Sequence, residues 1–162
     1  RPRKTDMPRS DRSVRRRASV QHDDVVTAGD VIQMDAVVAA CALVAQADGW
    51  VTPDERKRMV DRMRESASIR FFGLHEVLVG FEALNMRFDQ DLDDGEAMAE
   101  AAIAQLRGQP GPSRLLIETA CSVAEADGGF DAEERAALLR MCELLDLDPV
   151  RFDLISTERG RR

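Results

Sequence analysis

The sequence has no tyrosine, one tryptophan and six phenylalanines, so aromatic residues make up 4% of its 162 residues. A core with so few rings depends on leucine, valine, alanine and methionine, which suit helix packing. No segment alternates apolar and polar residues as a half-exposed strand does. No stretch approaches the roughly 18 uncharged apolar residues of a membrane-spanning helix, and the N-terminal region lacks the apolar segment of a secretory signal. We therefore expect an all-α protein in the cytoplasm.

Cysteine and histidine are also scarce. Cys41, Cys121 and Cys142 form no C-x-x-C pair and lie among apolar residues at helical spacing, which favours buried free thiols in a reducing compartment. His22 and His75 have no partner Ser or Cys in a recognisable catalytic arrangement. The sequence also lacks a phosphate-binding glycine loop and the spacing of zinc ligands. We therefore expect that the protein is not an enzyme.

Charge is divided unevenly along the chain, whose formal net charge is −7. Residues 1–22 contain eight Lys or Arg and two Asp, whereas the remainder has 15 basic and 28 acidic residues. We predict a basic, disordered arm over 1–28, a helical domain over 29–156 and a frayed tail over 157–162. The acidic domain should repel nucleic acid and attract cations or basic proteins, while the arm could touch acidic lipid or phosphate.

Apolar spacing and cap residues predict about seven helices. Thr52 should cap one of them, with Pro53 in its first position and Glu55 completing a capping box. The expected helices cover about 30–47, from 53 to between 65 and 68, 74–87, 92–106, 113–127, from 132 to about 145, and a short segment after Asp148. The first is apolar almost all round, which is typical of a central helix. Phe71-Phe72-Gly73 should form a loop that tucks in its two aromatic side chains, and Met98 should be buried in the fourth helix.

One short phrase occurs twice, and it is the strongest pattern in the chain. Its first copy is Ala45-Gln46-Ala47-Asp48-Gly49-Trp50-Val51-Thr52-Pro53-Asp54-Glu55-Arg56, and its second is Ala124-Glu125-Ala126-Asp127-Gly128-Gly129-Phe130-Asp131-Ala132-Glu133-Glu134-Arg135. An offset of 79 aligns the copies and also pairs Val38 with Ile117 and Met59 with Leu138. Matching apolar positions on both sides predict two helix-loop-helix halves packed as a pseudo-symmetric pair.

The acids of this phrase have a structural explanation. Asp48 and Asp127 could each close a turn, and Glu55 and Glu134 could complete capping boxes that contribute on the order of 1 kcal/mol each. However, Asp48 and Asp127 are expected at helix C-termini, where the helix dipole disfavours a negative charge. An acid in this place twice suggests a compensating cation.

The spacing Asp-Gly-x-Val/Phe-x-x-x-Glu also resembles the back half of an EF-hand calcium loop. The front half differs, because Val44 and Gln46 would occupy two ligand positions of the first copy, so neither turn alone should bind calcium tightly. A metal site would have to pool carboxylates from both copies, and oxygen ligands favour calcium or magnesium. The candidate ligands are Asp48, Glu55, Asp127 and Glu134, with Asp89, Asp91 or Asp93 as additions. From the residues alone, metal binding and helix capping are equally open.

Four stretches of the chain together resemble a known family. They are Cys41 to Gly49 with Glu55-Arg56, Ala124 to Asp131 with Glu134-Arg135, the acidic run Phe88 to Asp93, and Leu147-Asp148-Pro149-x-x-Phe152. The first two resemble the paired signatures of the tellurite-resistance TerB family, and the others resemble its middle and end. The likeness spans about residues 30–155 and leaves out the arginine-rich arm.

The resemblance implies an all-helical cytoplasmic domain of two similar halves, with acids of both halves on one surface that can bind metal. It also implies a role in tellurite resistance and stress response beside other tellurite-resistance proteins, some of them membrane proteins. TerB-like domains occur in fused proteins and co-chaperones as well. The alternative is therefore a helical adaptor whose acidic face docks a basic protein without metal. Tellurite is an anion, which argues against its direct capture by an acidic face.

Overall fold

The computed structural model describes residues 28–47, 52–125 and 130–155, and within these ranges the chain forms seven α-helices, one short 3-10 helix and no strand. The all-α class predicted from the sequence is therefore confirmed. Residues 1–27 of the predicted arm and all of the predicted tail lie outside the described residues. The helices are α2 (Ala28–Ala45), α3 (Pro53–Glu65), α4 (Ala67–Phe72), α5 (Leu74–Gln90), α6 (Leu92–Ala104), α7 (Pro110–Ala124), α8 (Ala132–Leu145) and the 3-10 helix η1 (Pro149–Phe152).

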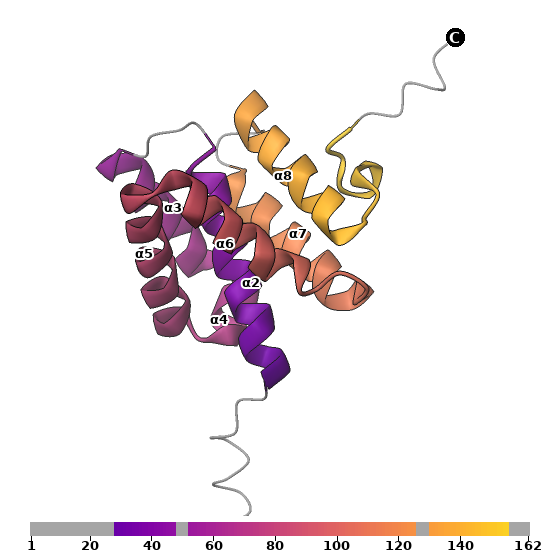
Figure 1. Cartoon of the computed structure of the whole chain (residues 1–162), viewed down its shortest axis with the longest axis horizontal. Helices are drawn as coiled ribbons and strands as arrows, with labels where there is room; N and C mark the ends of the chain where they lie inside the picture. Colours follow the sequence, from indigo (N-terminus) through magenta and orange to yellow (C-terminus); the bar gives the residue numbers. More distant parts are fainter. Residues whose placement is uncertain (1–27, 48–51, 126–129, 156–162) are drawn as a thin grey trace, which may run out of the picture.

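Helix α2 is the centre of the fold, as its nearly continuous apolar surface predicts. Every residue from Ala36 to Ala42 is buried, and α2 packs against α5, α6, α7 and α8. Figure 1 shows α2 running through the middle of the molecule with these helices around it. Because most side chains of this stretch are small, neighbouring helices can approach its backbone closely.

Both predicted capping boxes are present. Thr52 Oγ1 accepts from the Glu55 N–H at 3.2 Å, and Glu55 Oε2 accepts from the Thr52 N–H at 2.9 Å. Asp131 Oδ1 accepts from the Glu134 N–H at 2.7 Å, and Glu134 Oε2 accepts from the Asp131 N–H at 3.1 Å. The two boxes satisfy backbone donors that the first turn of a helix leaves without partners. They fix the starts of α3 and α8.

The helix boundaries follow the offset of the repeated phrase. Helices α2 and α7 end at Ala45 and Ala124, and helices α3 and α8 begin at Pro53 and Ala132, so each pair of boundaries is 79 positions apart. The repeated residues therefore occupy the same local positions in both copies. The pseudo-symmetric packing of the two halves stays a prediction.

The structure differs from the sequence-based expectation between α3 and α5. A loop was expected at Phe71, but Ala67–Phe72 forms helix α4, because the Ser66 side chain caps its start by accepting from the Ile69 N–H. The Phe71 side chain is 79% exposed, whereas Phe72 packs against the core. The expected burial of Met98 is also wrong, since this residue is 47% exposed.

Within the described ranges, no helix combines the length and the apolar character that crossing a membrane requires.

Candidate functional site

The two glutamates predicted as metal ligands are both held at helix starts. Glu55 and Glu134 each use Oε2 in a capping box, so capping is confirmed as one role of these side chains. The pKa of Glu55 is lowered, first because the Thr52 N–H donates to its carboxylate. A carboxylate has two oxygens and about four acceptor sites, so a capping bond is compatible with a metal bond at the same group.

The two predicted aspartates of the repeated phrase, Asp48 and Asp127, lie outside the described residues. Their surroundings are partly described, because Ala47 directly precedes Asp48. Ala47 lines one hollow together with Glu133, the neighbour of Glu134 at the start of α8. The end of α2 in the first copy therefore lies beside the start of α8 in the second copy, although the two segments are far apart in the sequence.

The additional acids Asp89 and Asp91 have protein partners. Asp89 Oδ2 lies 3.8 Å from Arg56 Nη2, and Asp91 caps helix α6 by accepting from the Asp94 N–H at 3.1 Å. In the part of the chain that the structure describes, no three His, Cys, Asp or Glu side chains converge as a ready ligand set. This absence does not test a site that pools Asp48 and Asp127 with the two glutamates, since both aspartates lie outside the described residues.

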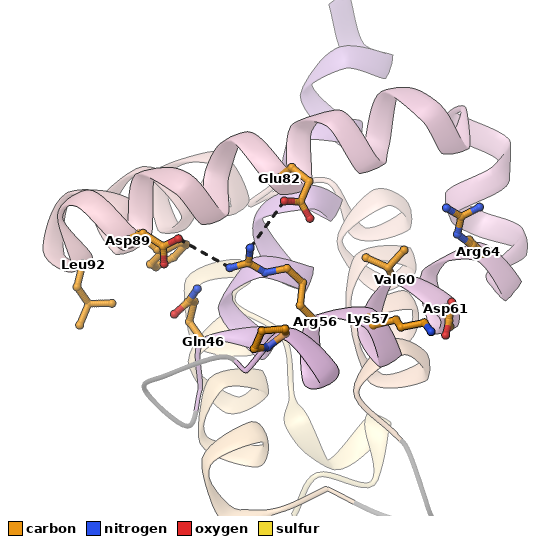
Figure 2. Close-up of a pocket in the computed structure, with 11 residues that line it drawn as sticks. Gln46, Arg56, Lys57, Val60, Asp61, Arg64, Glu82, Asp89 and Leu92 are labelled. Carbon is orange, nitrogen blue, oxygen red and sulfur yellow. Dashed lines mark ion pairs between the residues drawn. The ribbon is translucent and has the colours of Figure 1, made fainter.

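A groove of about 1080 Å³ runs between α3 and the C-terminal half of α5, and we call it the arginine groove. Arg56 lies on its wall, with Nη1 3.8 Å from Glu82 Oε2 and Nη2 3.8 Å from Asp89 Oδ2. Figure 2 shows the guanidinium pointing between these two acids. Its Nε is buried and has no hydrogen-bond partner among the described residues. At 3.8 Å the ion pairs are longer than hydrogen bonds, so Arg56 holds the two acids mainly through charge.

Sequence reasoning did not assign a role to Arg56, although the repeat contained the signal. Arg56 aligns with Arg135 at the offset of 79. The Arg135 guanidinium makes a different contact, because Nη1 donates to the carbonyl oxygen of Leu154 at 3.2 Å. The same residue in the same local position thus ties two different segments to its helix.

A second, smaller hollow of about 430 Å³ lies between α2, α6 and α8, and we call it the acidic hollow. It is lined by apolar side chains, which we call its floor, and by charged side chains, which we call its rim. The floor includes Leu43, Phe88, Leu92 and Ala137, and the rim includes Glu96, Glu100, Glu133 and Arg140. Arg140 donates to both oxygens of Glu100, at 3.2 Å from Nε and 3.0 Å from Nη2. The pKa of Arg140 is raised, first by this hydrogen bonding to Glu100.

The arginine groove and the acidic hollow are adjacent, because Gln46, Phe88 and Leu92 line both. Gln46 Nε2 donates to Oδ1 of Asn85 at 3.4 Å. Asn85 is buried, and its Nδ2 has no hydrogen-bond partner in the part of the chain that the structure describes. Phe88, in the wall that the two surfaces share, packs its ring and backbone closely against Gly95, which has no side chain to obstruct it. The two surfaces form one trough across the end of the molecule at which α2 ends and α8 begins.

The cysteines lie away from this trough. Cys41 and Cys142 are buried and Cys121 is partly buried, and all three are free thiols. Burial raises the pKa of Cys41 to about 12 and the pKa values of Cys121 and Cys142 to about 11. At neutral pH the thiols are therefore protonated and poor nucleophiles.

The family model described as "Tellurite resistance protein TerB" matches residues 34–157. The chain belongs to the TerB family. The tellurium resistance protein TerB of Alcaligenes sp is 32% identical to it over 84 residues, which cover 52% of this chain and 69% of that relative. No solved structure matches the chain.

The TerB match has a clear relation to the fold. It begins within α2 and extends past η1, so it includes both copies of the repeated phrase and the whole trough. The basic segment 1–22 lies outside the TerB match. The trough is therefore a property of the TerB part of the chain, and the arm is an addition to it.

Proposed function

We propose that this TerB chain acts in tellurite resistance as a non-enzymatic binding protein. It takes up a divalent cation, calcium or magnesium, through acids of both copies of the repeated phrase. The ligands are Asp48, Glu55, Asp127 and Glu134. Asp89 and Asp91 are the additions, although Asp89 would first have to exchange its contact with Arg56 for the metal.

One observation carries this proposal. Ala47 and Glu133 line the same hollow, and each is the direct neighbour of a proposed ligand, Asp48 and Glu134 respectively. A pooled site requires that the two copies lie side by side, and the hollow that they line together supports this. The ligands are all carboxylate oxygens, which calcium and magnesium prefer over nitrogen or sulfur.

The proposal is tested by titrating calcium and magnesium into the whole chain in a calorimeter. Asp48→Asn and Asp127→Asn should each abolish the heat of binding, because a shared site loses a charged ligand in either case. Asp30→Asn is the matched control, since Asp30 lies in the first turn of α2 at the opposite end of that helix. The control should bind as the wild type does.

Thermal unfolding provides the second measurement. A cation that binds only the folded chain increases the free energy of unfolding by mass action, by about 2.7 kcal/mol when its concentration is a hundred times the Kd. The melting temperature rises as a result. Millimolar cation should therefore raise the melting temperature of wild type and Asp30→Asn but not of Asp48→Asn. If wild type shows neither heat nor a melting shift, the acids serve as caps and the metal proposal fails.

The second candidate function is a helical adaptor that docks a basic protein without metal. The acidic hollow favours it, because an apolar floor beside carboxylates matches a basic, amphipathic segment. In either case the partners are other tellurite-resistance proteins, including a membrane protein, and the chain works in the cytoplasm. A chain that shows no cation effect yet captures a purified basic partner would fit this second function.

A further inference from the structure

The acidic hollow has the features of a docking groove for an extended segment. Leu43, Phe88 and Leu92 contribute apolar surface to it, and Leu92 is 50% exposed. An exposed leucine beside a concave apolar floor is surface that an occupant can cover. The volume of about 430 Å³ lies at the lower end of the range for small-ligand sites, about 300–1,000 Å³, which fits a few side chains.

The charges on the rim indicate the kind of occupant. Glu100 is already paired with Arg140. Glu96 and Glu133 also line the hollow, but neither forms an ion pair or a side-chain hydrogen bond with any residue in the described ranges. Two carboxylates without cationic partners at the edge of an apolar floor match arginine side chains, whose aliphatic part packs on apolar surface while the guanidinium binds carboxylate.

The chain itself contains such a segment. Arg15, Arg16 and Arg17 are followed by Ala18-Ser19-Val20, and Val14 precedes them. Three consecutive guanidinium groups flanked by small apolar side chains complement the rim and the floor of the acidic hollow. The arm lies outside the TerB match, so its binding to the hollow would be a feature of this chain beyond the family domain.

The arm is long enough to reach the hollow. From Ala28 to Ala47 at the hollow, a helical rise of about 1.5 Å per residue gives roughly 29 Å. An extended chain spans at most about 3.3–3.6 Å per residue, so the segment from Arg15 to Ala28 covers up to roughly 43–47 Å. The arginines can therefore turn back along α2 and lie at its C-terminal end.

We propose that the Arg15–Arg17 segment of the arm binds in cis to the acidic hollow through Glu96 and Glu133. The contact covers the hollow and occupies the face on which a basic partner would dock. It does not require a metal ion and so does not depend on the cation site. Because exposed ion pairs contribute only about 0–1 kcal/mol each, the arm can exchange with a partner of higher affinity.

Carbodiimide cross-linking of the whole chain tests this contact. The reagent joins an amine to a carboxylate that touches it, and the sequence has only two lysines, Lys4 and Lys57. Arg16→Lys therefore places one new amine in the arginine segment. Cross-linking is carried out in excess chelator, which separates the result from that of the cation experiment. Peptide mass spectrometry should find the introduced amine joined to Glu96 or Glu133.

Matched variants identify the site of the contact. In the Arg16→Lys background, Glu96→Gln with Glu133→Gln should remove the cross-link. Glu65→Gln with Glu76→Gln changes the net charge equally at two exposed glutamates elsewhere and should leave it unchanged. The yield should also fall roughly tenfold in about 1 M salt, where the Debye length is about 3 Å.

An equal mixture of 14N- and 15N-labelled protein distinguishes contacts within one chain from contacts between chains. Linked peptides of a single label support the proposal. Mixed-label peptides would show that the arm docks on a second copy and would overturn it. Cross-links spread over many acids would overturn it as well, and so would a cross-link that Glu96→Gln with Glu133→Gln does not change. In that case the arm would bind lipid or phosphate, and the hollow would bind a separate partner.

Discussion

The Arg62 side chain on α3 donates from Nε to the backbone carbonyl oxygen of Val123 in the last turn of α7, across 61 positions of sequence. The carbonyl groups at a helix C-terminus have no partner within the helix and carry the negative end of its dipole. The Arg62 guanidinium donates a hydrogen bond to one of these carbonyl groups and places a positive charge at the negative end of the dipole. The contact joins α3, which begins within the first copy of the repeated phrase, to α7, which ends at the first residue of the second copy.

Arg62→Ala should therefore destabilise the fold more than an ordinary surface change. Hydrogen bonds to charged groups contribute about 1.5–3 kcal/mol, and we expect a loss of this size in urea unfolding. Arg64→Ala is the matched control, because the exposed Arg64 side chain lies on the same helix and makes no hydrogen bond with a described residue. Equal losses in the two variants would show that the Arg62 contact does not hold α3 and α7 together.

Gly95→Ala should destabilise the wall between the arginine groove and the acidic hollow. A Cβ at Gly95 would lie 2.9 Å from Phe88 Cγ and 3.0 Å from Phe88 Cα, so both the ring and the backbone would have to move. We expect a cost of about 1–3 kcal/mol from overpacking. Gly111→Ala, which has nothing within 4 Å, should stay within about 0.5 kcal/mol of wild type. Chemical denaturation of both variants makes the comparison, and a neutral Gly95→Ala would contradict the close contact.

Glu55→Gln should change how stability depends on pH. Because the folded-state pKa of Glu55 is lowered, first by the hydrogen bond from the Thr52 N–H, its carboxylate stabilises the fold above its ordinary pKa of 4.5. That stabilisation is lost as the pH falls through the lowered pKa. The melting temperature of wild type should thus exceed that of Glu55→Gln at neutral pH, and the difference should shrink in acid. Glu65→Gln, which removes an exposed glutamate outside any capping box, is the control, and a difference independent of pH would contradict the prediction.

Deletion of residues 1–27 should leave the folded domain nearly as stable as before. The buried core is formed by side chains of α2 to α8 together with Leu106 and Leu154, and docking of the arm in a surface hollow adds only weak contacts. We expect the helical circular dichroism of the described elements to persist and the melting temperature to change by less than about 4 °C. A fall of more than roughly 8 °C would mean that the arm contributes to the packing of the domain.

The sequence by itself determined the features that depend on residues close together in the chain. Thr52 and Glu55, like Asp131 and Glu134, are three positions apart, so each capping box could be predicted from the pattern alone, and both are present. The central place of α2 was also predictable, because a helix with so little polar surface must be buried on most sides. The same local pattern carried the resemblance to the TerB family that the comparison confirmed.

Only the tertiary structure decided which distant side chains meet. Arg56 lies between Glu82 and Asp89 because α3 packs against α5, and no local spacing signals such a pair. The burial of Met98 was predicted wrongly for the same reason. The helical period identifies the apolar face of a helix, but it does not show whether another helix packs on that face. The acidic hollow likewise exists because Ala47 and Glu133 come together from separate halves of the chain. Backbone caps form within one turn of helix, whereas a trough between helices depends on how all of them pack.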